Sequence, residues 1–511
     1  MRFWLAVICL VFISTGCSRE KGKNEPPASQ DLERSARSLA KAYCTNCHSY
    51  PEPSLLDKST WKKHVLPRMG YMYGIYPHDS VRMKLIGRGA SGEMVKKANT
   101  FPPHQLLPDS IWVKIQHYYL SHAPDSLEII SDEIRTGLKL FEVVETPYRL
   151  SPPGTTCVAF AGDGLYIADA HSQKLYQFNR KLQLPNVANT KEGAVWLNNR
   201  EKSLFITVMG SFSPTDAPSG FLMELPKEGK GKARKIISQL RRPVHSSFGD
   251  LNQDGLEDIV ICEFAKWTGR LTWREKTPDR KYISHLLSTR PGPIKAYIKD
   301  FDNNGLPDII ALFGQGDEGI FAYYNQGNGV FREEALLRFP PSYGSSYFNF
   351  FDYNEDGFDD IIHTAGDNAD YPPLMKPYHG IRIYRNNGAN QFEEVFFWHQ
   401  NGAYNAIPLD FDQDGDIDIA SISFFPDFEK TPDESFVYLE NKGDGKFEAS
   451  TFKDPSRGRW IVMDHADWDN DGDEDLVLGA LAFEVVPDTK GYVKKWMESG
   501  LSFIILENKL Q

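Results

Sequence analysis

Cysteine is scarce in this chain, with six among 511 residues, which is too few for a disulfide-based scaffold of this length. Positive charge is also in deficit, because 57 Lys and Arg face 69 Asp and Glu and the formal net charge is −12. A general nucleic-acid binder needs a basic face, so we expect no nucleic-acid partner. Beyond the first residues the sequence has no long apolar run, and hence no candidate transmembrane helix. The composition, 41% hydrophobic and 25% charged, is that of a globular protein.

The N-terminal segment combines a positive start, a short apolar run and a cysteine. Arg2 precedes apolar residues at positions 3–13, a run too short to span a bilayer but typical of a signal peptide. Small residues then lead directly to Cys17, and this arrangement resembles a bacterial lipoprotein signal. The resemblance implies a signal peptide at 1–16, lipid on Cys17 and a flexible tether at 17–30. It also implies export and membrane anchoring, with the outer membrane favoured and the protein facing the periplasm or the surface. The alternative is an ordinary signal peptide with an incidental cysteine.

A c-type haem attachment motif follows the tether. Residues 31–43 place apolar side chains on one helical face and lead into Cys44-Thr45-Asn46-Cys47-His48. Two thiols on one turn form thioethers to the haem vinyl groups, and the adjacent histidine ligates the iron. No second cysteine or histidine pair follows at zinc-ligand spacing, and no βαβ pattern supports a thioredoxin-like site. The motif therefore predicts one covalent haem c in a small all-α, cytochrome c-like domain at 31–124, with a linker at 125–136.

The sixth iron ligand is less clearly marked. The final helix of this domain is expected at 111–120, and Phe101, in the segment before it, stands where cytochromes of this type often have a methionine. Phenylalanine cannot ligate iron, so another residue must do so. Met69 is our first candidate, as a haem-binding and iron-ligating residue. The alternatives are Met72, Met83, Met94, His64 and His104.

Internal repetition dominates the rest of the sequence. Five loops share oxygen-bearing residues at positions 1, 3, 5 and 9 and a glycine at position 6. Their predicted ligands are Asp250, Asn252, Asp254 and Asp258; Asp300, Asp302, Asn304 and Asp308; Asp352, Asn354, Asp356 and Asp360; Asp410, Asp412, Asp414 and Asp418; and Asp467, Asp469, Asp471 and Asp475. Hard oxygen ligands around a sharp turn favour calcium, so we expect up to five calcium ions. These loops also account for much of the negative charge.

These loops are not EF-hands. Position 12 is never glutamate, and a strand-like run follows each loop where an EF-hand has a helix. Each repeat continues with an aromatic-rich strand, a Gly/Asn turn and a last strand, which describes a four-stranded propeller blade. Here the sequence resembles the FG-GAP/VCBS repeat family of β-propellers, whose blades carry a calcium loop between their first two strands.

Two degenerate blades precede the five repeats, which predicts an all-β, seven-bladed propeller at 137–511. The last blade lacks a fourth strand, and residues 138–145 resemble the missing one, so we expect this N-terminal strand to close the ring. Cys157 and Cys262 fall in blades that are not neighbours, which favours buried free thiols over a disulfide.

Overall the chain resembles bacterial lipoproteins that fuse a small cytochrome c domain to such a propeller. The resemblance implies a lipid-anchored electron carrier whose propeller docks a redox protein partner. A second hypothesis is a propeller that binds a glycan or a protein and carries an accessory haem. Trp267, Trp273, Trp398 and Trp460 are candidates for sugar stacking, although packing in the blade core is favoured for each. A haem-coupled dehydrogenase is the third. It is the least favoured, because no quinone-cofactor motif or catalytic set stands apart from the loops.

Overall fold

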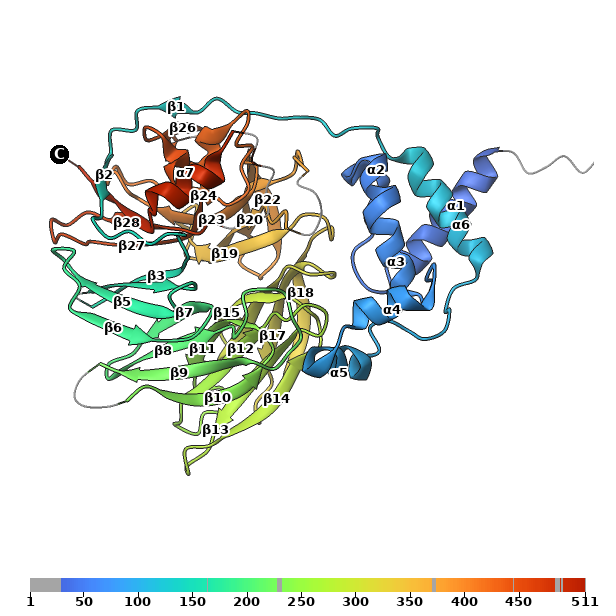
Figure 1. The fold of residues 1–511 in the computed structure, drawn as a ribbon, viewed down its shortest axis with the longest axis horizontal. Coiled ribbons are helices and arrows are strands. Elements are labelled where there is room, and N and C mark those ends of the chain that lie inside the picture. The colour runs from blue at the N-terminus through green and yellow to red at the C-terminus, as the bar shows by residue number, and fades with distance from the viewer. Residues whose placement is uncertain are drawn as a thin grey trace, which may run out of the picture.

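The molecule consists of a helical N-terminal part, blue to teal in Figure 1, and a ring of β-sheets, teal through green and yellow to red. The computed structural model describes residues 29–510 except 163, 228–231, 370–373, 444, 483–487 and 489. The predicted signal peptide, Cys17 and nearly all of the tether lie outside the described residues. Within the described part of the chain, no helix combines the length and apolar character that a membrane crossing requires.

The helical part packs its last helix against its first. Its helices are α1 (Ser29–Cys44), α2 (Lys58–Thr60), α3 (Leu66–Met72), α4 (Asp79–Ile86), α5 (Gly89–Ala98) and α6 (Asp109–His122), with short helical turns at Pro53–Leu55 and Trp61–Val65. Contact between α1 and α6 buries Ala40, Ile115 and Tyr119 to 1% exposure or less. The first helix begins two residues before the expected domain boundary at residue 31, and the final helix is longer than the predicted 111–120.

Seven blades form the ring, as predicted; six are four-stranded antiparallel sheets, and blade 6 has a fifth, parallel strand. The first three blades are β3 (Thr155–Ala161), β4 (Gly164–Asp169), β5 (Lys174–Asn179) and β6 (Asn186–Asn189); β7 (Ala194–Asn199), β8 (Ser203–Val208), β9 (Gly220–Pro226) and β10 (Arg234–Leu240); and β11 (Pro243–Gly249), β12 (Asp258–Glu263), β13 (Arg270–Lys276) and β14 (Tyr282–Ser288). Blades 4 and 5 are β15 (Pro293–Lys299), β16 (Asp308–Phe313), β17 (Gly319–Asn325) and β18 (Phe331–Arg338); and β19 (Ser345–Phe351), β20 (Asp360–Ala365), β21 (Gly380–Asn386) and β22 (Phe392–His399).

Blades 6 and 7 draw on the N-terminal segment. They are β23 (Ala403–Leu409), β24 (Asp418–Ser423), β25 (Phe436–Asn441), β26 (Phe447–Thr451) and β1 (Arg135–Thr136); and β27 (Trp460–Ala466), β28 (Asp475–Ala480), β29 (Phe503–Asn508) and β2 (Phe141–Glu145). The predicted closing strand is confirmed, because Phe141 pairs with Asn508 and Glu145 with Ile504. The parallel pairing of β1 with β26 was not predicted, and α7 (Tyr492–Ser499) is an unpredicted insertion between β28 and β29.

Burial explains the strand sequences. The second strand of a blade has neighbouring blades on both faces, so it is a continuous apolar run; all six residues of β16 are buried. The outer strand β18 is mostly exposed and carries charged residues. The first strands of successive blades contact one another around the centre, from β3 through β27 and back to β3, which closes the ring.

The two faces of the ring carry different loops. Because neighbouring strands are antiparallel, loops between first and second strands emerge on one face, and all five acidic loops lie there. Loops between second and third strands, and loops between blades, emerge on the opposite face. We call this opposite face the docking face, since the helical part contacts it.

Two of the cysteines and two of the candidate tryptophans are buried in the propeller. Cys157 and Cys262 are buried free thiols, as expected. Trp273 and Trp460 are 2% and 0% exposed, so neither is available to stack on a sugar, and core packing is the correct reading for both.

Candidate functional site

The Cys44–His48 segment forms the C-terminal end of α1. Backbone bonds from Thr45 to Lys41 (3.1 Å) and from Asn46 to Tyr43 (3.4 Å) continue the helix as a turn beyond Cys44. Both thiols are free, with Cys44 half-buried and Cys47 exposed. The sequence-predicted attachment residues therefore stand on one turn, with His48 directly after them.

His48 is held in the form that ligates a metal. Its Nδ1 lies 2.8 Å from the carbonyl oxygen of Ser49. A carbonyl only accepts hydrogen bonds, so Nδ1 carries the proton and Nε2 keeps its lone pair. The side chain is nearly buried, and burial lowers the pKa of His48, which favours the neutral imidazole. Both effects match the requirements of an axial iron ligand.

An aromatic cluster surrounds this turn. Tyr119 donates a hydrogen bond to the Pro51 carbonyl (2.8 Å), and its ring centroid is 4.4 Å from that of Trp61. The Tyr50 hydroxyl is buried and has no hydrogen-bond partner among the described residues. Half-buried apolar side chains, including Leu55, pack against the same cluster. The half-covered apolar surface and the unpaired hydroxyl fit a planar apolar group with polar substituents.

Met69, the predicted sixth ligand, lies in α3 and is half-buried in the cluster that contains Cys44. Met72 packs instead in a second cluster around Phe101, and Met83 is 55% exposed. Phe101 itself is 2% exposed and belongs to the core. The choice of Met69 as ligand stays a prediction, and its packing against the same apolar cluster as Cys44 is compatible with it.

The helical part is seated on the docking face across blades 2 to 5. Ser91 accepts a hydrogen bond from the backbone N–H of Asp216 (3.1 Å), in the β8–β9 loop. Phe101 packs edge-on against Trp267 of the β12–β13 loop, with ring centroids 5.2 Å apart. Tyr378, in the β20–β21 loop, donates to the carbonyl of Leu55 (2.8 Å). The contacts therefore come from loops opposite the acidic ones.

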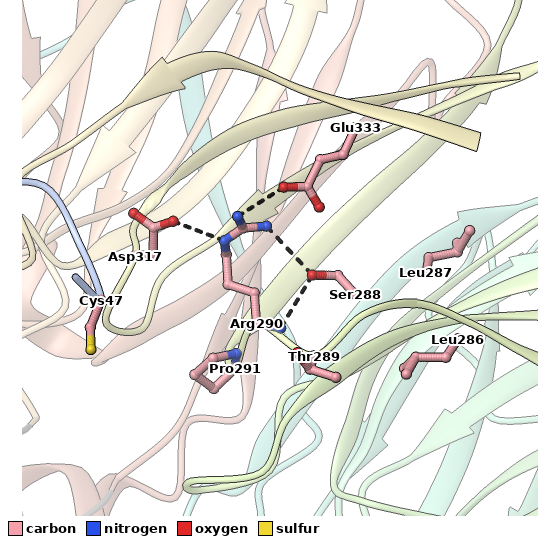
Figure 2. A pocket seen from close by; sticks show the side chains of 9 residues that line it. All are labelled: Cys47, Leu286, Leu287, Ser288, Thr289, Arg290, Pro291, Asp317 and Glu333. Carbon is pink, nitrogen blue, oxygen red and sulfur yellow. Dashed lines mark hydrogen bonds and ion pairs between the residues drawn. The ribbon is translucent and has the colours of Figure 1, made fainter. Parts of the chain in front are cut away.

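A pocket of about 520 Å³ lies between the haem motif and the propeller, within the range of about 300–1,000 Å³ typical of small-molecule sites. Cys47 is its lining residue from the helical part, and the other lining residues belong to blades 3 and 4 (Figure 2). They are Leu286, Leu287, Ser288, Thr289, Arg290, Pro291, Asp317 and Glu333. Sequence reasoning missed all of these propeller residues.

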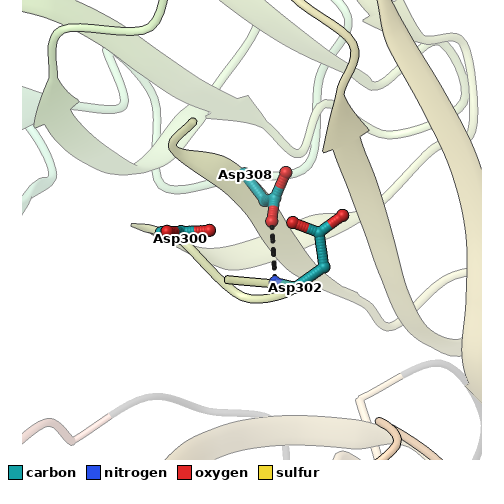
Figure 3. Close-up of side chains that lie close together, drawn as sticks. All are labelled: Asp300, Asp302 and Asp308. Carbon is teal, nitrogen blue, oxygen red and sulfur yellow. Dashed lines mark hydrogen bonds between the residues drawn. The ribbon is translucent and has the colours of Figure 1, made fainter. Parts of the chain in front are cut away.

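The five acidic loops share the predicted sharp turn. The position-6 glycines have φ between 81° and 100°, a conformation that favours glycine. Three carboxylates lie within 4.8 Å of one another in each of three loops, and could hold a cation together. These groups are Asp300, Asp302 and Asp308 (Figure 3); Asp410, Asp412 and Asp418; and Asp467, Asp469 and Asp471. The loops that begin at Asp250 and Asp352 have asparagine at position 3.

The position-9 aspartates have a second role that the sequence did not reveal. All five are 0% exposed, and each carboxylate accepts one backbone N–H from position 2 of its own loop and one from the end of the third strand. Asp308, for example, accepts from Phe301 (2.9 Å) and Asn325 (2.7 Å). The same pair of bonds recurs in the other loops at Asp258, Asp360, Asp418 and Asp475. This carboxylate therefore fastens the loop to the third strand with or without a cation.

Burial raises the pKa of each position-9 carboxyl, because a charged group is disfavoured in an apolar environment. The effect brings the pKa of Asp418 to about 6 and that of Asp475 to about 7. A bound cation would favour the ionised carboxylates.

Two asparagines at the ends of third strands, Asn325 and Asn508, bond to the neighbouring blade. Asn325 Nδ2 donates to the carbonyl of Leu251 in the loop of blade 3 (2.8 Å), and Asn508 Nδ2 donates to the carbonyl of Phe411 in the loop of blade 6 (2.8 Å). Asn386 and Asn441 stand at the same position but donate to carbonyls of their own blade, those of Asp359 (3.1 Å) and Ile417 (3.2 Å).

Comparison with known proteins identifies the repeats. A family model described as FG-GAP-like repeat matches residues 300–363 and 410–478, which include four of the five acidic loops. The chain thus contains FG-GAP-like repeats within a seven-bladed β-propeller. No curated protein matches the chain.

Several solved structures align with much of the chain at low identity. The N-terminal domain of Nup159 has 10% identity and a TM-score of 0.41, over 74% of this chain and 98% of that chain. BBS1N, solved in complex with ARL6DN, has 8% identity and a TM-score of 0.44, over 74% and 100%. Saccharomyces cerevisiae Sqt1 has 10% identity and a TM-score of 0.40, over 70% and 84%. At such identities the likeness concerns the fold alone.

Proposed function

We propose that this protein is an exported, lipid-anchored c-type cytochrome that transfers electrons through one covalently bound haem. The observation that carries the proposal is the Cys44–Cys47–His48 turn, with Nε2 of a neutral His48 left available beside a half-buried aromatic cluster. Lipid on Cys17 would hold the protein at the membrane, with the outer membrane favoured.

The residues present fit haem c. Cys44 and Cys47 would attach it, and His48 and Met69 would ligate its iron. The bound haem would supply one-electron chemistry at its iron. The chain contributes the imidazole orientation, through the Ser49 carbonyl, and apolar walls that exclude water. The unpaired Tyr50 hydroxyl is available to donate a hydrogen bond to a polar substituent.

The propeller has two roles in this proposal. Its docking face holds the helical part through Asp216, Trp267 and Tyr378, so it positions the haem domain of its own chain. Its remaining surface is available to a redox protein partner, the docking role that the resemblance implies. The acidic loops lie on the opposite face, so calcium there would stabilise the blades and would not act on the haem.

A propeller that binds a protein or glycan and carries an accessory haem is the second candidate. The FG-GAP-like repeats at 300–363 and 410–478 favour it, because they are explained without reference to electron transfer. The buried Trp273 and Trp460 weaken its glycan form. A haem-coupled dehydrogenase remains the third and least favoured reading.

The test is an optical redox titration of the full chain, produced with a cytochrome c maturation system. We expect a reversible one-electron transition and rapid oxidation by a soluble c-type cytochrome. His48→Ala should alter the spectrum, and His122→Ala, on the surface of α6, is the matched control. A haem that never changes oxidation state with physiological donors or acceptors would favour the binding module.

A further inference from the structure

The interdomain pocket brings charged propeller side chains to the proposed haem attachment site. Cys47 lines one side, and the β14–β15 and β16–β17 loops line the other (Figure 2). Because Cys47 would be bonded to the haem, the edge of that group must lie close to whatever faces this thiol. The pocket is therefore where the propeller can act on the redox centre.

Arg290 is the most constrained of these side chains. Its Nε donates to Asp317 (3.1 Å), and its second terminal nitrogen donates to Glu333 (3.0 Å). Its guanidinium carbon lies 3.7 Å from the ring centroid of Phe321. The side chain is 16% exposed, as against 14% for Asp317. A partly buried, forked ion pair stacked on an aromatic ring has a fixed position, unlike a mobile surface pair.

Asp317 extends this charge arrangement toward the motif. It also pairs with Arg338, at the end of β18. Asp317 and Arg290 line the same pocket as Cys47. Charges of the propeller therefore lie at the proposed haem attachment site.

We propose that Arg290, fixed by Asp317 and Glu333, lines the haem site from the propeller side and tunes the reduction potential of the iron. The inference rests on the haem-binding function proposed above. Reduction adds one electron to ferric iron and gives the ferrous form, with the electron drawn from the donor or the electrode. A cation nearby disfavours the more positive ferric form, and a carboxylate favours it. Arg290 thus raises the reduction potential and Asp317 lowers it. The helical part would hold the haem, and the propeller would help to set its potential.

The experiment is a spectroelectrochemical titration of the full-length holoprotein and single variants. We expect Arg290→Gln to lower the midpoint potential and Asp317→Asn to raise it, with the absorption maxima of the haem unchanged. Arg290→Lys keeps the positive charge, so its midpoint potential should stay close to that of the wild type. Arg135→Gln is the matched control, because Arg135 pairs with Glu448 (2.9 Å) on blade 6, and it should leave the potential unchanged.

Opposite shifts distinguish tuning from damage, since a merely structural role would move both variants in the same direction. If Arg290→Gln fails to fold, Asp317→Asn must still raise the potential. Shifts of the same sign, or shifts no larger than that of Arg135→Gln, overturn the inference while the proposed cytochrome function stands. A wild-type chain without haem overturns both.

Discussion

The double role of the position-9 aspartates leads to a sharp prediction at Asp308. Replacing Asp308 with alanine removes the acceptor of two buried backbone N–H groups, those of Phe301 (2.9 Å) and Asn325 (2.7 Å). Hydrogen bonds to a charged group contribute about 1.5–3 kcal/mol each, and both donors would be left unpaired. We therefore expect Asp308→Ala to lower the free energy of unfolding by about 3–6 kcal/mol even in chelator.

Asp302 is the matched control, because it is a candidate ligand in the same loop but is exposed. In chelator, Asp302→Ala should cost about 0.5 kcal/mol or less, as expected for a surface substitution. In calcium, both variants should lose the stabilisation that this loop gains from the cation. The assay is urea unfolding followed by tryptophan fluorescence, with and without calcium. Equal losses for the two variants in chelator would refute the fastening role of Asp308.

Three further predictions concern pH, the sixth ligand and ring closure. Burial raises the pKa of Asp475 to about 7, so between its usual value and pH 7 the folded state binds more protons than the unfolded one, and the calcium-free protein should lose stability as pH rises. Thermal unfolding in chelator at pH 5.5 and 8 should show this loss. Calcium should oppose the loss, and Asp475→Asn should reduce it. A melting temperature that rises with pH equally in the wild type and in Asp475→Asn would contradict the expected direction. Met69→Ala should change the reduced haem spectrum and lower the potential, whereas Met83→Ala, at a 55% exposed position, should not; an unchanged Met69→Ala spectrum would exclude this ligand. Deleting residues 137–147 removes β2 and exposes the edge of β29, so folding should fail or the melting temperature should fall steeply. Deletion of residues 126–130 should have little effect. Unchanged stability after the first deletion would show that β2 is not needed to close the ring.

The repeats were predictable because their information is local. The spacing of acidic residues, the position-6 glycine and the following apolar run recur in each blade, so blade number and loop position could be read from the sequence. Ring closure was also predictable, since residues 138–145 supply a strand that the last blade lacks. The Cys44–His48 motif is equally local, because all of its residues stand within five consecutive positions.

The remaining features depend on contacts between distant segments. The second role of Asp308 becomes visible only when the third strand ends beside its loop. Nothing local marks Arg290 or Asp317, because their proposed role depends on the seating of the helical part on blades 3 and 4. The parallel pairing of β1 with β26 was also missed, because a two-residue strand has no periodicity to detect.

The covalent state of Cys44 and Cys47 tests the central claim most directly. Intact-protein mass spectrometry and peptide mapping of the full chain, produced with a cytochrome c maturation system, would report it. We expect one haem per chain, attached within the peptide that contains both cysteines and retained after acid–acetone extraction. Cys44→Ala/Cys47→Ala should release it, whereas Cys157→Ala/Cys262→Ala should not. A wild-type chain that emerges from a functional maturation system with both thiols free would contradict the account.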